Sequence, residues 1–290
     1  MGGLMRFSCL GFHSSLYPYR PLVNRYARLG LHPYNMKEVT NFKLHHLIKF
    51  NFRSSGASSF LMTLAAVDPV ANSLVQTFQV QVDEANCGFL DVICSISRIR
   101  GDTTSERFSS SYDNARLPDW PSHNFIDSQR FYLVQGSELP YPHWIYLYLE
   151  LAVLKYDIRI SDVNLSFSLF LHINAHTTEG DCWLLLQDFF WSNLEIVQVA
   201  IETTEEAPLQ AKNSILYITF KGLATGGIGQ HVERKAIIKS FFSEPSGFLS
   251  LKGHLCKEEE EDLSHTATIN RLREISRRNR ELYLRSRTTV

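Results

Sequence analysis

The residue type in this chain that could most readily bind a metal ion or move a proton is histidine, of which there are 11. His45 and His46 are adjacent, and neighbouring side chains on a regular strand point to opposite faces, so the pair is not expected to share one ion. His172 and His176, with Glu179 nearby, have a spacing that would suit two ligands on a helix. No third ligand completes a motif. We therefore expect surface or packed histidines, with no metal and no cofactor.

Three other patterns that can accompany chemistry do not predict a site here. Residues 222–229 are rich in glycine, but a phosphate-binding loop also needs a following Lys-Ser or Lys-Thr and a helix N-terminus, and a strand is expected here instead. Ser246 stands in an expected turn rather than in a Gly-x-Ser-x-Gly elbow. The adjacent carboxylates Glu205 and Glu206 fall in an expected exposed turn. The sequence therefore predicts no catalytic residue and a protein that is not an enzyme.

The cysteines predict neither a disulfide framework nor a metal site. Five cysteines, without zinc-ligand or redox spacing and without a secretory signal, suit a reducing compartment, so we expect the cytoplasm or nucleus. Residues 1–37 lack acidic residues, as a weak organelle transit segment would, but Tyr17 and Pro18 are typical of an ordered loop. The five are Cys9, Cys87, Cys94, Cys182 and Cys256.

Composition places the chain among globular proteins. Hydrophobic residues make up 44% and charged residues 20% of the 290 residues, which is ample for a packed core and unlike a disordered chain. A formal net charge of −1 gives no global field that would attract nucleic acid or an anionic membrane. No apolar run approaches the ~20 residues that span a bilayer. We expect no membrane association and no small-molecule substrate.

The end of the chain is the part that most resembles a partner-binding element. After an acidic run at 258–262, apolar residues recur at near-heptad spacing among arginines, which predicts a short amphipathic helix. It is too short for a coiled coil that stands alone, and Arg277-Arg278-Asn279-Arg280 lacks the interleaved aromatics that stack on bases. We expect a protein partner or self-association rather than nucleic acid. The predicted contact residues are Ile269, Leu272, Ile275 and Leu282.

The elements that must position these residues follow one order twice. In each half, apolar spacing typical of a helix precedes several segments with strand-like alternation, which indicates an α+β fold. Pro33 is expected at a helix start or break, because its ring removes a hydrogen-bond donor. The expected helices are 22–37 and 144–156, and the expected strands are 43–53, 60–67, 75–82, 89–99, 194–202, 214–221, 234–242 and 248–251.

Several ordered blocks resemble the plant Male Sterility Five family over about residues 22–255. This resemblance implies a plant protein of unknown biochemical activity, with links to reproductive or embryonic development for some members. The blocks are Gly30-Leu31-His32, Tyr34-Asn35, Thr40-Asn41, Thr63-Leu64-Ala65-Ala66-Val67-Asp68-Pro69, Gln76-Thr77-Phe78-Gln79-Val80, Leu117-Pro118-Asp119-Trp120-Pro121, Arg130-Phe131-Tyr132-Leu133-Val134, Leu147-Tyr148-Leu149-Glu150-Leu151-Ala152 and Leu209-Gln210-Ala211-Lys212-Asn213.

The order of elements in the first half also resembles the cystatin fold, in which a sheet wraps one helix. We therefore predict two cystatin-like units, each a helix packed on an antiparallel sheet, plus the C-terminal amphipathic helix. Cystatins inhibit cysteine proteases through a Gln-x-Val-x-Gly loop, and the corresponding turn at 53–59 lacks both the Gln and the Val. Inhibition is accordingly the alternative, and a non-enzymatic interaction module is the prediction. The predicted boundaries are 1–21 extension, 22–100 first module, 101–129 linker, 130–255 second module and 256–290 charged tail.

One segment interrupts the family resemblance. Residues 167–193 add Phe and Trp residues but no Lys or Arg, between blocks that the family pattern joins almost directly. One interpretation is a partner-binding insertion with exposed aromatics. The favoured interpretation is a translated intron or gene-model artefact, since translated plant introns are rich in Phe, Leu and Ser.

Overall fold

A computed structural model describes most of the chain up to residue 256 and places residues Met1–Leu255 in one compact unit, with Cys256–Val290 as a second. The predicted tail helix and residues 167–193 both lie outside the described residues. The described residues are 4–10, 20–55, 57–69, 74–86, 89–102, 116–122, 125, 127–139, 143–160, 194–222 and 232–256.

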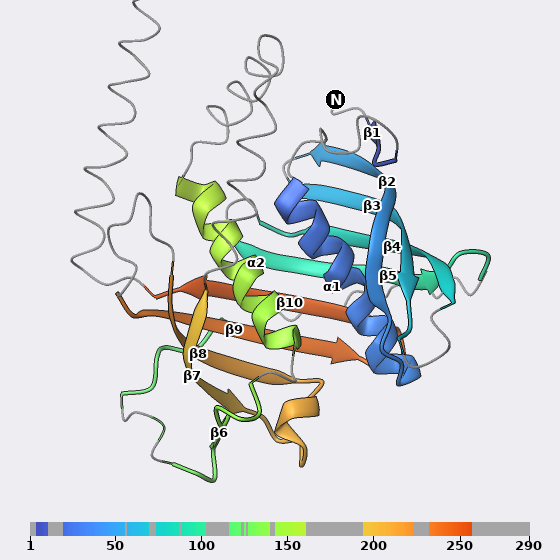
Figure 1. Cartoon of the computed structure of the whole chain (residues 1–290). Helices are drawn as coiled ribbons and strands as arrows, with labels where there is room; N and C mark the ends of the chain where they lie inside the picture. The colour runs from blue at the N-terminus through green and yellow to red at the C-terminus, as the bar shows by residue number, and fades with distance from the viewer. Residues whose placement is uncertain are drawn as a thin grey trace, which may run out of the picture. The chain divides into compact units, whose positions relative to one another are not determined.

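The compact unit is built on one antiparallel sheet of ten strands (Figure 1). The strands lie in the order β1-β2-β3-β4-β5-β10-β9-β8-β7-β6, so each half of the chain forms one half of the sheet. Their bounds are β1 Leu4–Ser8, β2 Lys43–Ser55, β3 Ala57–Val67, β4 Val75–Glu84, β5 Leu90–Ile99, β6 Phe131–Leu133, β7 Glu195–Glu202, β8 Ser214–Lys221, β9 Arg234–Ser243 and β10 Phe248–Leu255.

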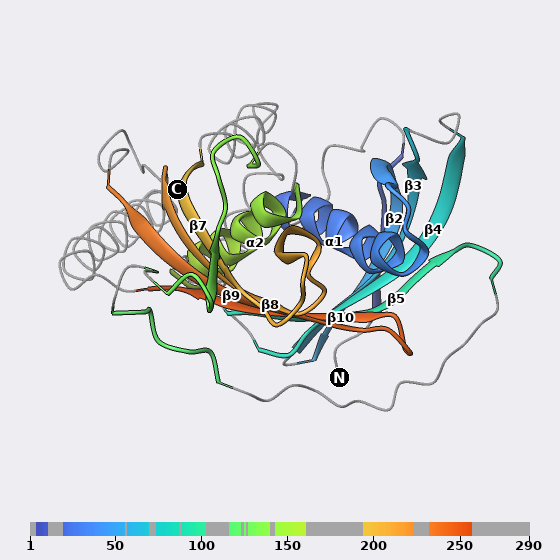
Figure 2. The ribbon, with the colours of Figure 1, turned by 90° about the horizontal axis from the view of Figure 1, so that it is seen from below.

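Two helices, α1 (Arg20–Glu38) and α2 (His143–Ile160), cover one face of this sheet. Figure 2 shows both of them in the trough formed by the curved strands. α1 packs on β2–β5, α2 packs on β5, β9 and β10, and the two helices contact each other. We call the face that carries the helices the inner face and the opposite one the outer face.

Alternation along the strands explains why one face is apolar. In β4, Phe78, Val80 and Val82 point inward and are at most 2% exposed, whereas Gln79 and Gln81 between them are half-buried on the outer face. This period of two places every second residue against the helices. Burying such side chains at about 25 cal/mol per Å² of apolar surface is the main force that holds the helices on the sheet.

Gly30 shows how closely α1 approaches the sheet. A Cβ atom at this position would lie 2.7 Å from the Cβ of Val80, which is closer than real contacts allow. The hydroxyl of Ser97 in β5 also donates a hydrogen bond to the Gly30 carbonyl at 2.5 Å. Glycine is therefore required here by the contact between α1 and the sheet.

The predicted α+β fold of two cystatin-like units is wrong, because the structure is a mostly-sheet fold with two helices. The structure has one sheet dominating the fold, in which β5 pairs with β10 from Cys94↔Leu249 to Leu90↔Gly253. A separate unit would leave the edges of β5 and β10 unpaired, and pairing them satisfies their backbone donors and acceptors. The helices predicted at 22–37 and 144–156 and the predicted strands are nevertheless present, so the error lies in their assembly.

The expectation for Pro33 is also wrong, because α1 continues through it to Glu38. Its ring is buried against the core, and this burial offsets the loss of the hydrogen bond that an N–H at this position would donate to the Leu29 carbonyl. By contrast, the predicted turn at Ser246-Gly247 is confirmed, since Gly247 has φ of +65° and donates its N–H to the Ser243 carbonyl.

Candidate functional site

The most strongly buried polar cluster lies between both helices and β4. The carboxylate of Glu84 accepts a hydrogen bond from the Tyr26 hydroxyl of α1 at 2.7 Å and forms an ion pair with the ammonium of Lys155 of α2, also at 2.7 Å. The side chains of Lys155 and Glu84 are 3% and 5% exposed. Burial, together with the adjacent Glu84 charge, raises the pKa of Tyr26 well above its ordinary value, so the phenol stays protonated and donates.

A second ion-pair group joins the same two helices nearer the surface. Glu150 of α2 forms an ion pair with the Nε of Arg25, 3.2 Å away, and accepts a hydrogen bond from an Nη of Arg28 at 3.0 Å, both in α1. The two arginines are one turn apart, so they approach one carboxylate from the same face of α1. Charged residues of α1 and α2 are thus directed at each other.

His32 is half-buried between the helices, against the rings of Trp144 and Tyr148 at centroid distances of 6.4 and 5.7 Å. Burial lowers the pKa of His32 to about 4, so the imidazole is neutral near pH 7. The Trp144 indole donates to the Leu209 carbonyl at 3.2 Å, which connects this aromatic group to the loop between β7 and β8. His32 therefore packs against aromatic rings of α2.

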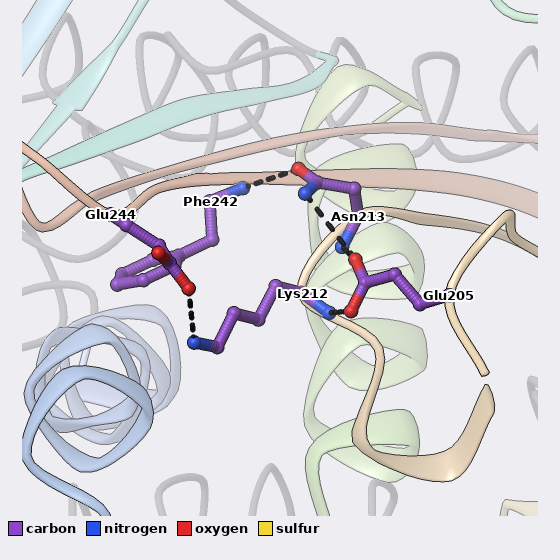
Figure 3. Close-up of polar contacts among 5 residues, drawn as sticks. All are labelled: Glu205, Lys212, Asn213, Phe242 and Glu244. Atoms are coloured by element: carbon purple, nitrogen blue, oxygen red, sulfur yellow. Dashed lines mark hydrogen bonds and ion pairs between the residues drawn. The ribbon is translucent and has the colours of Figure 1, made fainter. Parts of the chain in front are cut away.

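The loop between β7 and β8 contains a network centred on Glu205 (Figure 3). Its carboxylate accepts the backbone N–H groups of Lys212 at 3.0 Å and Asn213 at 2.7 Å, after the short helix η1 (Pro208–Gln210). The Asn213 side chain accepts the N–H of Phe242 in β9 at 3.1 Å. Lys212 forms an ion pair with Glu244 at 2.5 Å. These contacts fix the loop onto β9.

The outer face of β7–β9 is covered by residues that precede β6. Trp120 and Phe125 form edge contacts with each other and pack around Tyr217, which is fully buried. The ammonium of Lys235 lies 5.4 Å above the Trp120 ring. Part of the segment predicted as a linker, 101–129, is therefore packed against the sheet.

The same outer face carries a Tyr-Glu-Arg group. Arg130 contacts both carboxylate oxygens of Glu202, at 2.8 and 3.3 Å, and the Tyr217 hydroxyl donates to Glu202 at 2.7 Å. Burial and the neighbouring Glu202 charge raise the pKa of Tyr217. The arrangement holds β6, β7 and β8 in register and leaves the phenol engaged as a donor.

On the other half of the outer face, polar groups gather around Asp83. Its carboxylate accepts from Ser59 at 2.5 Å, from Gln81 at 2.9 Å and from Ser95 at 2.9 Å, which lie on β3, β4 and β5. These side chains form a polar surface across three strands.

The structure corrects the prediction for His45 and His46. The pairing of β2 with β3 shifts register between Leu44 and His46, which is a bulge, and the two Nδ1 atoms lie 2.6 Å apart. A bulge places two residues opposite one partner residue, so the alternation that was expected to separate the imidazoles is interrupted.

Among the described residues, no three His, Cys, Asp or Glu side chains are placed to hold a metal ion together. Cys9 and Cys94 are buried thiols, and burial raises the pKa of Cys9 to about 11 and raises the pKa of Cys94 further. No helix in the described part of the chain has the length and apolarity to cross a bilayer. The predicted contact residues Ile269, Leu272, Ile275 and Leu282, and also His172 and His176, lie outside the described residues.

Sequence reasoning missed Glu84 and Lys155. A signal for Glu84 was present, because it continues the inward phase of Phe78, Val80 and Val82. A carboxylate in that phase needs a buried partner, and Lys155 stands within the apolar helix 144–156. Nothing in the local pattern shows that these two residues meet.

These features define a sheet-dominated protein in which two helices cover one face of a single antiparallel sheet. The family model of Protein MS5 matches residues 117–251. The chain belongs to the plant MS5 family. It is 41% identical to the UPF0725 protein EMB2204 of Arabidopsis thaliana over 86% of this chain and 71% of that protein. Another Arabidopsis thaliana UPF0725 protein is 40% identical over 88% of this chain and 75% of its own length.

A solved structure agrees with this assignment. The crystal structure of MS5 from Brassica napus superimposes with a TM-score of 0.59 at 29% sequence identity, covering 82% of this chain and 99% of that chain. The resemblance inferred from the sequence blocks is therefore confirmed. The blocks also have structural explanations, since Gly30, Trp120, Arg130 and Asn213 each make contacts that hold the fold.

Proposed function

We propose that this MS5 family chain is a non-enzymatic protein-interaction module, acting in the cytoplasm or nucleus in plant reproductive or embryonic development. The observation that supports this most is the use made of the polar side chains. Glu84, Lys155, Glu150 and Glu202 each bind a partner within the same chain, and these pairs connect helices and strands to one another.

A catalytic group has a different environment from these pairs. Catalysis needs a side chain that faces a substrate and changes its protonation state or charge during the reaction. Here the buried charges are directed at each other, and the phenols of Tyr26 and Tyr217 are engaged as donors to carboxylates. This arrangement stabilises a rigid body, on which binding surfaces can be presented.

The partner-binding element of this proposal is the apolar stripe Ile269, Leu272, Ile275 and Leu282. Burying such side chains stabilises an interface by roughly 1.5–3 kcal/mol each. In the sequence, the stripe follows Leu255, the last residue of the unit that contains the sheet.

The test compares the whole chain with a variant in which the four stripe residues are changed to serine. A matched control changes Arg271, Arg273 and Arg280 to glutamine, which removes charge from the same segment and leaves the stripe intact. We expect the stripe variant to lose self-association in sizing experiments, or a reproducible partner in affinity purification from flower buds, while the control keeps it. Saturable turnover of a substrate, abolished by changing one polar cluster, would overturn the proposal.

The alternative of cysteine-protease inhibition has no specific support. It depended on cystatin-like units, and the sheet is continuous across both halves. The turn that would enter a protease, at 53–59, lacks the inhibitory residues. Assaying the purified chain against a panel of papain-like enzymes would test it directly, and we expect no inhibition.

A further inference from the structure

The histidine pair on β2 has a geometry that the other described histidines lack. We propose that His45 and His46 form a bidentate site for a divalent transition metal that favours tetragonal nitrogen coordination, such as Ni²⁺ or Cu²⁺. The bulge between Leu44 and His46 brings their Nδ1 atoms to 2.6 Å, with ring centroids 4.9 Å apart.

This separation is close to that of two ligands on one metal ion. With metal–nitrogen bonds of about 2.05 Å, two ligands at a right angle are about 2.9 Å apart, and two at a tetrahedral angle are about 3.3 Å apart. The imidazoles must therefore move apart by about 0.3 Å to bind a tetragonal ion and by about twice that for a tetrahedral one. The pair thus favours Ni²⁺ or Cu²⁺ over Zn²⁺ in tetrahedral coordination.

The protonation of the two imidazoles also favours metal binding. Two Nδ1 atoms at this distance cannot both carry a proton, so at least one lone pair is directed at its neighbour. Imidazole is a preferred ligand for these ions, and it binds them through such a lone pair. A cation bound by both Nδ1 atoms displaces the proton between them, which moves to the Nε2 of the same imidazole or to solvent.

A metal ion can reach the two histidines from solvent. His45 is exposed and His46 half-buried. β1 pairs with β2 only at residues 49–53, so no described strand pairs with that side of β2 at 43–47, whereas β3 pairs with the opposite side. Water can occupy the remaining coordination positions, and a small movement of the two rings does not disturb the core.

The experiment uses the full chain in a non-coordinating buffer near pH 7.5. Bound Ni²⁺ is counted by equilibrium dialysis for the unchanged chain, for the double variant His45→Asn with His46→Asn, and for His143→Asn. His143 is an exposed histidine at the start of α2 and serves as the matched control. We expect the double variant to bind one equivalent fewer than both other proteins.

A second readout identifies the site in the unchanged chain, whatever other ligands the chain holds. Diethylpyrocarbonate modifies free imidazoles, and mass spectrometry locates the products. Ni²⁺ should protect the peptide that contains His45 and His46 and leave the modification of His143 unchanged. Equal Ni²⁺ binding by all three proteins, or modification of His45 and His46 that Ni²⁺ does not reduce, would overturn the proposal.

Discussion

At the scale of single residues, Val39 has a strained backbone conformation, and its side chain is too exposed to offset that strain by packing. It follows α1 with φ of +54°, and its side chain is 91% exposed. A β-branched residue in the left-handed region costs roughly 1–2 kcal/mol. Asn35 maintains this conformation, because its side chain binds the Thr40 hydroxyl, the Phe42 N–H and the Phe42 carbonyl at 2.8–2.9 Å.

Replacing Val39 with glycine should therefore stabilise the protein. Glycine adopts positive φ without strain but loses more entropy on folding, so we expect a net gain of about 0.5–1 kcal/mol in the free energy of unfolding. The free energy of unfolding is measured by urea denaturation, monitored by circular dichroism. The control Val39→Ala keeps most of the strain and should change stability by less. A destabilised glycine variant would show that the valine side chain makes a needed contact.

His32 makes the free energy of unfolding depend on pH. Its folded pKa of about 4 lies below the ordinary value of 6.5, so the unfolded chain binds the proton first as the pH falls. The stability that the neutral imidazole contributes is present above pH 6.5 and is lost progressively toward pH 4. Between pH 7 and pH 5 we expect a loss of about 2 kcal/mol from this group.

The measurement is the difference in unfolding free energy between pH 7 and pH 5 for the unchanged chain and for His32→Gln. The glutamine variant cannot titrate in this range, so its difference should be smaller by about 2 kcal/mol. The variant will also be less stable at both pH values, because it disturbs the contacts with Trp144 and Tyr148. Identical pH dependence in the two proteins would contradict the assignment.

At the scale of secondary-structure elements, the cluster of Glu84 and Lys155 joins β4 to α2, and Tyr26 adds α1. Removing one member of a buried ion pair leaves the other charge without compensation, at a cost of about 3–5 kcal/mol. We expect Glu84→Leu and Lys155→Met each to lose stability of this order in chemical denaturation.

The combined variant Tyr26→Phe, Glu84→Leu and Lys155→Met should recover most of that loss, because it leaves no buried charge or hydroxyl unpaired. Tyr26→Phe alone is the control and removes one hydrogen bond, worth about 1 kcal/mol. If the losses of the single variants simply add in the combined variant, the three groups do not act as one cluster.

The loop between β7 and β8 depends on one carboxylate. Glu205 accepts two backbone N–H groups and the Asn213 side chain, whereas its neighbour Glu206 is exposed. Glu205→Ala should lower the free energy of unfolding by about 1–3 kcal/mol, since these donors lose a charged acceptor. Glu206→Ala is the matched control and should change it by less than about 0.5 kcal/mol. Equal effects of the two substitutions would show that the network is not important.

The helices and most strands could be predicted from the sequence, but the pairing of the strands into one sheet could not. Periodicity located α1, α2 and most strands, because burial acts on every second or every third to fourth residue. The pairing of β5 with β10 left no such pattern, since backbone hydrogen bonds do not depend on side-chain identity. The bulge at His45 was hidden for a similar reason, because an extra residue changes alternation only locally. The contact of Glu84 with Lys155 joins positions 71 residues apart.

At the scale of the whole molecule, that β5–β10 pairing predicts that both halves unfold together. Met1–Leu255 is one compact unit, and the helices of the two halves contact each other across the seam. All four tryptophans, Trp120, Trp144, Trp183 and Trp191, belong to the second half of the sequence or to the segment that leads into it. Tryptophan fluorescence therefore reports on a part of the sequence that does not include β3.

Leu64→Ala tests this coupling from the other half. Leu64 is fully buried on the inner face of β3, and such a truncation costs about 2–5 kcal/mol. If the sheet unfolds as one unit, the urea midpoint seen by tryptophan fluorescence should fall by the same amount as the midpoint seen by circular dichroism. The exposed substitution Leu74→Ala, near the start of β4, is the control and should leave both midpoints nearly unchanged. A fluorescence midpoint that stays constant while the dichroism curve splits into two steps would show that the halves fold independently despite sharing a sheet.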